Sequence, residues 1–95
     1  MKIPKTCKIG GYNYEVKFVE NRTKDNGDSH PASVSSQWQK IFIDSNQHKE
    51  GQESSFIHEI LEAIDYHYQI GLPHDKISVL ETALYGVLSE NNLLK

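Results

Sequence analysis

With 95 residues, 37% of them hydrophobic and 24% charged, the chain has the length and composition of one small domain, residues 1–95, around one modest core. The net charge is -3 and the ten Lys and Arg residues are dispersed, while apolar runs are too short for a bilayer, so we expect a cytoplasmic protein with no nucleic-acid partner and no membrane partner. The single cysteine, Cys7, excludes an internal disulfide and a thiolate zinc site.

The beginning of the chain predicts a β-hairpin over residues 6–19. Gly10 and Gly11 tolerate the positive φ of a tight turn, and the segment after them alternates between apolar and polar residues. The residues that share its apolar face are Tyr12, Tyr14, Val16 and Phe18. The hairpin therefore supplies the first two strands of a small sheet.

The next segment predicts one or two further strands. Residues 20–36 are rich in Asn, Asp, Ser and Gly, which indicates a loop with a short edge strand around residues 32–35. Alternation around Ile41 and Ile43 predicts another strand within residues 38–44. We therefore expect a sheet of the antiparallel type within about residues 5–44.

From about residue 52 the hydrophobic period becomes that of a helix. One helix is predicted over about residues 52–70, ended by Gly71 and Pro73, and a second over residues 74–90. The expected apolar stripe of the first is Ile57, Ile60, Leu61, Ile64 and Tyr68. That of the second is Ile77, Leu80, Leu84, Val87 and Leu88. The fold class predicted is α+β, with the sheet packed against two C-terminal helices.

The first helix carries His58-Glu59-Ile60-Leu61-Glu62, a near copy of the zinc-protease signature H-E-x-x-H in which a glutamate replaces the second histidine. His58 and Glu62 are four residues apart, so both project from one helix face and can reach one metal ion. Glu59 stands between them, where it would serve as the general base. The pentapeptide therefore predicts two metal ligands and one catalytic carboxylate.

A third ligand has to come from the second helix. Glu81 is the first candidate, because antiparallel packing about the turn near Gly71 would bring it level with Glu62. His74 is the second candidate and would reach the site if the helices cross obliquely. Tyr85 is a further candidate that could steady an oxyanion, although the edge of a small core is the more ordinary place for a tyrosine.

These residues resemble a group of small uncharacterised proteins of bacteriophages and mobile elements. The likeness lies in His58-Glu59-x-x-Glu62-Ala63, in Leu72-x-His74-x-x-Ile77-x-x-Leu80-Glu81-x-x-Leu84-Tyr85, and in Ile9-Gly10-Gly11-Tyr12-x-Tyr14-x-Val16. Those proteins carry a full H-E-x-x-H and look like minimal zincins of the gluzincin type. The resemblance implies a zincin-like fold in the cytoplasm of a bacterial host, zinc ligands at His58, Glu62 and Glu81, and a general base at Glu59.

The glutamate at position 62 changes the chemistry expected of such a site. A second carboxylate ligand would make the metal a poorer Lewis acid, and oxygen ligands make manganese or ferrous iron alternatives to zinc. If His74 joins the site, a set with two histidines is restored. The third alternative is a protein that binds no metal.

Three functions follow. The first is a metal-dependent hydrolase of the peptidase type, with an edge strand near residues 38–44 aligning an extended peptide. The second is an inactive zincin-like accessory protein that binds a protein partner. The third is a structural domain without metal, whose polar residues orient the two helices. A homodimer is compatible with each, because added buried surface would supplement a small core.

Overall fold

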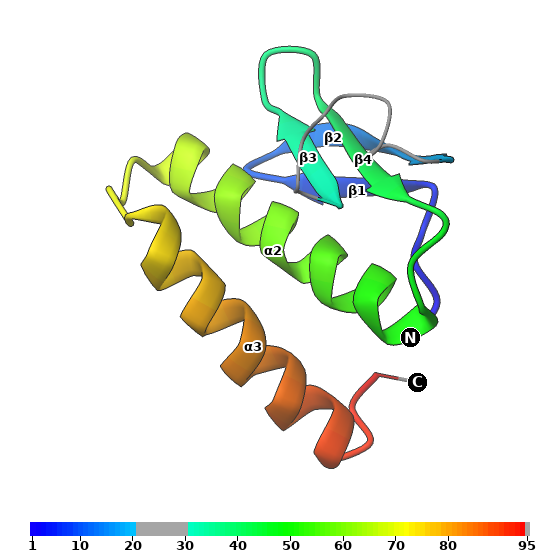
Figure 1. Ribbon diagram of the computed structural model, residues 1–95. Coiled ribbons are helices and arrows are strands. Elements are labelled where there is room, and N and C mark those ends of the chain that lie inside the picture. The colour runs from blue at the N-terminus through cyan, green and yellow to red at the C-terminus, as the bar shows by residue number, and fades with distance from the viewer. Residues whose placement is uncertain (21–30, 95) are drawn as a thin grey trace.

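Four strands precede two helices in the computed structural model, which describes residues 1–20 and 31–94 (Figure 1). The strands are β1 (Thr6–Ile9), β2 (Tyr12–Val19), β3 (Ala32–Ser35) and β4 (Lys40–Asp44), and the helices are α2 (Lys49–Tyr68) and α3 (His74–Glu90). The predicted α+β class and the N-terminal hairpin are confirmed. Most of the loop predicted over residues 20–36 lies outside the described residues.

The sheet is mixed, with strand order β1-β2-β4-β3. The outer pairs are antiparallel, but β2 and β4 run parallel, with Val16 opposite Ile41 and Phe18 opposite Ile43. The prediction of an antiparallel-type sheet is therefore wrong for the central pair, because β4 forms its own hairpin with β3 and that hairpin sets its direction. The edge strand expected near residues 38–44 is also corrected: β4 is interior, and β3 forms that edge.

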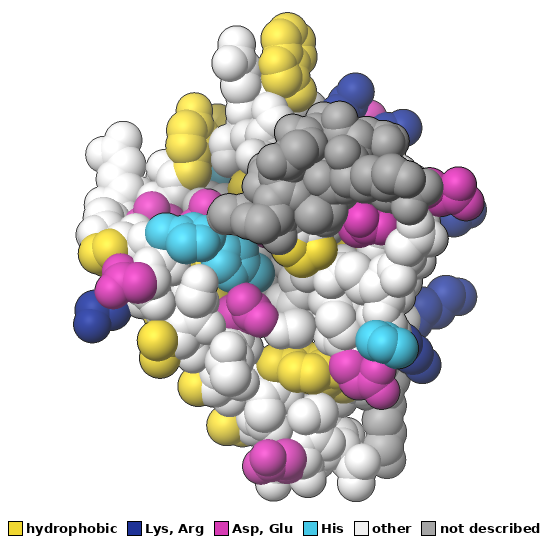
Figure 2. All heavy atoms as spheres, in the orientation of Figure 1, with side chains coloured by type: hydrophobic (Ala, Val, Ile, Leu, Met, Phe, Trp, Pro, Cys, Tyr) yellow, Lys and Arg dark blue, Asp and Glu magenta, His cyan; other side chains and the backbone are white. Residues whose placement is uncertain are grey.

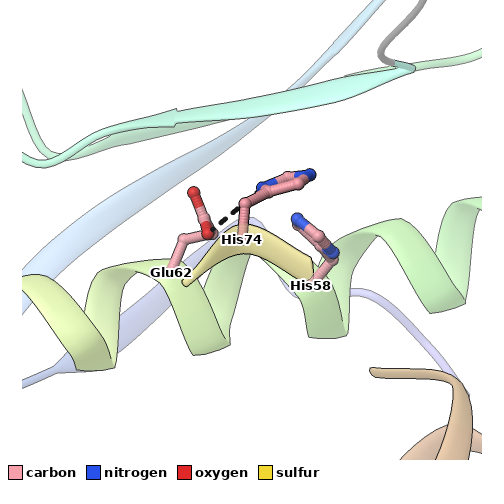
Figure 3. A group of neighbouring side chains, drawn as sticks. All are labelled: His58, Glu62 and His74. Carbon is pink, nitrogen blue, oxygen red and sulfur yellow. Dashed lines mark ion pairs between the residues drawn. The ribbon is translucent and has the colours of Figure 1, made fainter. Parts of the chain in front are cut away.

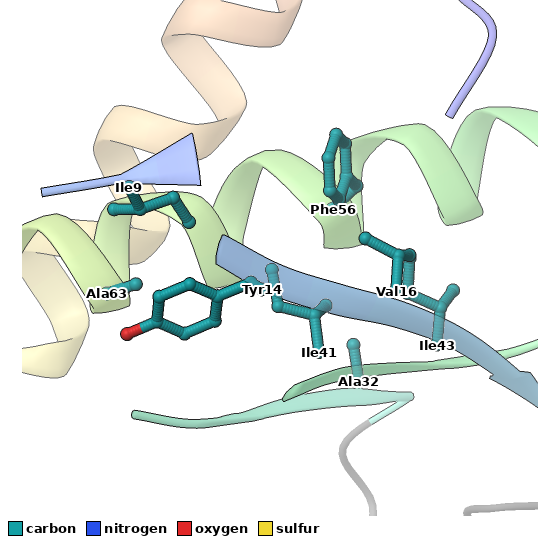
Figure 4. Packing of buried hydrophobic residues seen from close by; sticks show 8 residues of the cluster. All are labelled: Ile9, Tyr14, Val16, Ala32, Ile41, Ile43, Phe56 and Ala63. Atoms are coloured by element: carbon teal, nitrogen blue, oxygen red, sulfur yellow. The ribbon is translucent and has the colours of Figure 1, made fainter. Parts of the chain in front are cut away.

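The hydrophobic core lies between α2 and one face of the sheet (Figure 1). Every strand contributes to it, as Figure 4 shows: Ile9, Tyr14, Val16, Ala32, Ile41, Ile43, Phe56 and Ala63. Burial of Tyr14 and Val16 agrees with the alternation predicted for β2. Tyr12 and Phe18, near its two ends, are 51% and 47% exposed, so the buried part of β2 is shorter than its alternation suggests.

The two helices occupy separate layers. α2 rests on the sheet, and α3 lies along α2 on the side away from the sheet (Figure 1). Of the stripe predicted for α2, Ile57 is buried and Ile60 and Ile64 pack against the core, but Tyr68 is exposed. Of the stripe predicted for α3, Ile77 is buried, whereas three members remain exposed: Leu80, Leu84 and Val87. A helix that packs on one other helix buries a narrower face than one enclosed between layers.

A tight connection joins the helices and places the start of α3. α2 ends at Tyr68, its C-cap residue Gln69 has the left-handed φ of 51°, and Gly71 follows with φ 83°. The N–H of Leu72 donates to Asp65 Oδ1 at 2.8 Å, and Pro73 occupies the N-cap position of α3. The chain therefore turns back at once, and His74 begins α3 beside α2. None of the helices described in residues 1–20 and 31–94 is long and apolar enough to cross a membrane.

Candidate metal centre

His58, Glu62 and His74 form a group at the junction of the two helices (Figure 3). One ligand atom of each lies within 4.8 Å of the others, and His74 Nδ1 is 3.7 Å from Glu62 Oε1. The imidazole rings of His58 and His74 are 4.9 Å apart between centroids. Ligand atoms around a tetrahedral zinc ion lie about 3.3 Å apart, so small side-chain rotations would bring these three groups to ligand spacing.

The local folding of each helix explains why these side chains meet. His58 and Glu62 lie one turn apart on the same face of α2. The turn at Gln69 to Pro73 returns the chain so that His74, the first residue of α3, faces Glu62. His74 is thus brought to the site, although the sequence ranks it behind Glu81.

Glu81 lies one turn nearer the start of α2 than the sequence suggests, beside His58 rather than Glu62. Its Oε1 is 2.9 Å from His58 Nδ1, and its Oε2 accepts a hydrogen bond from the hydroxyl of Ser54. An ionised carboxylate can only accept in such a contact, so His58 donates through Nδ1–H, and Nε2 is the ring nitrogen left to bind a metal. This contact fixes the tautomer and the orientation of the ring, as carboxylates do for metal-binding histidines.

Sequence reasoning missed Ser54, which holds the second oxygen of Glu81. Its position four residues before His58 on α2 is the signal that could have identified it, since residues at this spacing share a helix face. Ser54 and His58 together fix both oxygens of Glu81. The Glu81 side chain is 21% exposed and that of His58 12%, so solvent screens this contact only in part.

Glu59 is one of the few buried charged residues in the described part of the chain, with 6% exposure. It lines a cavity of about 300 Å³ together with residues of α2, α3 and the edge of the sheet: Pro31, Ala32, Ser55, His58, His74 and Glu81. A neighbouring cavity of about 290 Å³ shares His58, Glu59 and His74 and adds Glu62. The predicted base and the three-residue group therefore line two cavities that share residues, and Figure 2 shows histidine and acidic side chains close together at the surface.

Tyr85 lies in a different cluster. Its hydroxyl donates to Glu53 Oε1 at 2.7 Å, and Glu53 Oε2 is 3.2 Å from the amino group of Met1. Burial, followed by the adjacent Glu53 carboxylate, raises the pKa of Tyr85 to about 12. Burial alone would raise the pKa of Glu53, but the Tyr85 hydrogen bond and the Met1 amino group outweigh it and lower that pKa. Tyr85 thus joins α3 to α2 as a protonated donor.

Comparison of the chain with protein-family models, curated proteins and solved structures gives no match. The fold and the site define a small α+β protein with a His/Glu group that could hold a metal ion. Any chemistry at that group has to be judged from its own donors, distances and burial.

Proposed function

We propose that the protein is a metal-dependent hydrolase that binds zinc through His58, Glu62 and His74. The observation that supports this most is the convergence of two imidazoles and one carboxylate from two helices, with ligand atoms within 4.8 Å of one another. Two histidines and a glutamate are a known donor set of catalytic zinc, and three protein ligands leave a position open. His74 then supplies the imidazole that the signature lacks at position 62. The donor set still consists of two histidines and one glutamate, as in a zincin, but the second histidine comes from α3 and the glutamate from α2.

Charge also favours this set over the one with Glu81. Two neutral imidazoles and one carboxylate leave a divalent ion with a net positive charge, whereas one imidazole and two carboxylates would neutralise it. Imidazole nitrogens also favour zinc over manganese. When bound, the ion would supply Lewis-acid chemistry and make a coordinated water more acidic.

The other residues around the site have separate roles in this proposal. Glu81 holds His58 through Nδ1, which keeps Nε2 directed away from the carboxylate and ready to bind. Glu59 is buried on the cavity wall, and its proposed role is to take a proton from a water molecule in the cavity. Ser33 and Val34 of β3 line the neighbouring cavity, so an extended peptide lying along this edge of the sheet would pass the site. A peptide or protein is therefore the substrate class we propose.

Metal analysis of the full chain, purified without chelator, tests the site. Wild-type protein should carry zinc in stoichiometric amount, and His58→Ala and His74→Ala should lose it. His48 is exposed and precedes α2, so His48→Ala is the matched control and should retain the metal. Unchanged zinc content in both site variants would rule out this site.

Turnover tests the hydrolase. Zinc-loaded protein should cleave members of a synthetic peptide pool, and Glu59→Gln should abolish cleavage while the zinc content stays unchanged, because the amide cannot accept the proton. Zinc binding without cleavage of any peptide would leave a metal-binding protein and refute the hydrolase.

A metal-free structural role is the second candidate, and one observation favours it. Glu81 already bonds both His58 and Ser54, so the polar cluster links α2 to α3 without an ion. This role predicts that wild-type protein purifies without stoichiometric metal and that added zinc leaves its thermal unfolding unchanged. The zinc site predicts the reverse of both: stoichiometric zinc in the purified protein and a change in thermal unfolding when zinc is added.

A further inference from the structure

α3 carries a row of exposed apolar side chains that α2 does not cover. Val79, Leu80, Leu84 and Val87 are between 41% and 65% exposed. With the exposed Ala83 they form what we call the α3 stripe: Val79, Leu80, Ala83, Leu84 and Val87. Figure 2 shows hydrophobic side chains following one another along this edge of the molecule. Single exposed apolar residues are ordinary, but a contiguous row on one helix indicates an interface.

The spacing within the stripe is that of a helix that packs against another helix. Leu80, Ala83 and Val87 are three and four residues apart, the pattern of the seam between helices that cross at a shallow angle. Lys76 and Glu90 extend it by four residues before Leu80 and three after Val87. Val79 and Val87 lie four residues before and after Ala83, and Lys76 and Glu90 lie seven residues before and after it, so these positions are symmetric about Ala83. The small side chain of Ala83 allows two helices to approach closely.

The charges at the two ends of the stripe select the partner and its direction. Lys76 and Glu90 are both exposed and lie in the first and last turns of α3. If a second copy packs antiparallel about a twofold axis at Ala83, Lys76 lies opposite the partner's Glu90, and symmetry repeats the pair. Parallel packing would instead oppose Lys76 to Lys76 and Glu90 to Glu90. We infer that the α3 stripe is the interface of an antiparallel homodimer.

This interface is separate from the candidate metal centre. Glu81 and Ile77 face α2, whereas Val79, Ala83 and Val87 of the stripe lie on another side of α3. The dimer would therefore leave the cavity beside Glu59 open, and metal binding and dimerisation can be measured independently. Loss of one would say nothing about the other.

Sedimentation velocity of the full chain tests the proposal. Wild-type protein should sediment as a dimer with twice the 10.9 kDa mass of the chain. Leu80→Glu should raise the dimer dissociation constant about 30-fold or more, as expected for the loss of a central interface residue. Thr82→Glu, also exposed on α3 but outside the stripe, is the matched control and should remain dimeric. A wild-type monomer, or a dimer unaffected by Leu80→Glu, would overturn the proposal.

A charge exchange tests the antiparallel register and does not depend on the apolar core of the interface. Lys76→Glu and Glu90→Lys should each weaken the dimer roughly threefold, since each places like charges opposite one another. The double variant restores opposite charges and should return the dissociation constant to the wild-type value. If both single variants weaken the dimer and the double variant fails to restore it, the antiparallel register is wrong. Circular dichroism of each variant confirms that α3 is still folded.

Discussion

Two carboxylates of the helix pair each accept a hydrogen bond from the opposite helix. Glu81 of α3 accepts from His58 of α2 at 2.9 Å, and Glu53 of α2 accepts from Tyr85 of α3 at 2.7 Å. Hydrogen bonds to ionised acceptors are stronger than neutral ones, particularly where burial limits screening. The first contact orients a residue of the candidate metal centre, while the second fastens the helices at another level.

The Tyr85 contact predicts a stability change at alkaline pH. Folding raises the pKa of Tyr85 from 10.0 to about 12, so the folded state retains the proton that the unfolded chain releases. The contribution of this group is therefore complete below pH 10 and is lost as the pH rises toward 12. Urea unfolding at pH 9 and pH 11 should show a loss of stability that is smaller in Tyr85→Phe. Tyr68 is exposed, and Tyr68→Phe should behave like the wild type. Equal pH dependence in all three proteins would contradict this assignment.

Glu53 of the same cluster gives the opposite pH dependence, because it reduces the stability of the fold as the pH falls. The pKa of Glu53 is lowered on folding, so its contribution is present above the ordinary glutamate pKa and is lost as the pH falls through the lowered value. Glu53→Gln should therefore reduce the loss of stability between neutral and acidic pH, measured by urea unfolding. If Glu53→Gln loses as much stability at acidic pH as the wild type does, the loss comes from other carboxylates.

At the scale of elements, the hairpin docks on the end of α2 through His67. Tyr12 stacks on the His67 ring at 4.8 Å between centroids, and the Tyr14 hydroxyl lies 2.5 Å from His67 Nε2. Gly10 passes so close that a Cβ there would lie 2.9 Å from two His67 carbons. Gly10 is therefore needed both for its positive φ and for close packing.

The two turn glycines allow these effects to be separated. Gly10→Ala and Gly11→Ala both place a side chain at positive φ, but a Cβ at Gly11 has no described atom within 4 Å. Gly10→Ala should therefore cost about 1–3 kcal/mol more in free energy of unfolding, the usual range for an overpacked site. Chemical denaturation of the two variants measures the difference. Equal destabilisation would mean that backbone strain alone accounts for Gly10.

The elements that could be predicted are those whose signals are local. Gly10-Gly11 and the alternation through Tyr14 and Val16 identify the hairpin, and the changed period locates both helices. The parallel pairing of β2 with β4 could not be predicted, because strand pairing depends on contacts between distant segments. The same limit affected the site: His58 and Glu62 share a helix, whereas the place of His74 depends on the turn geometry at Gln69.

At the scale of the whole molecule, α2 is the central layer between the sheet and α3 (Figure 1). α3 is held mainly through α2, by Ile77 and by the contacts of Glu81 and Tyr85. An ion bound by His58, Glu62 and His74 would add a further link between the two helices. Metal binding and the stability of the helix pair should therefore be coupled.

This coupling predicts a thermal shift. Zinc at about 100 times its dissociation constant should stabilise the folded protein by about 2.7 kcal/mol, seen as a higher melting temperature. His58→Ala should show little or no shift, and His48→Ala should show the wild-type shift. Equal shifts in wild type and His58→Ala would indicate that zinc binds elsewhere.

The most direct test of the central claim compares His74 with Glu81 as the third ligand. Zinc is titrated calorimetrically into the full chain and into His74→Ala and Glu81→Ala. Removing the orienting Glu81 should weaken zinc binding about 10–100-fold, and removing the ligand His74 should weaken it further. A larger loss in Glu81→Ala than in His74→Ala, or no loss in His74→Ala, would contradict a centre formed by His58, Glu62 and His74.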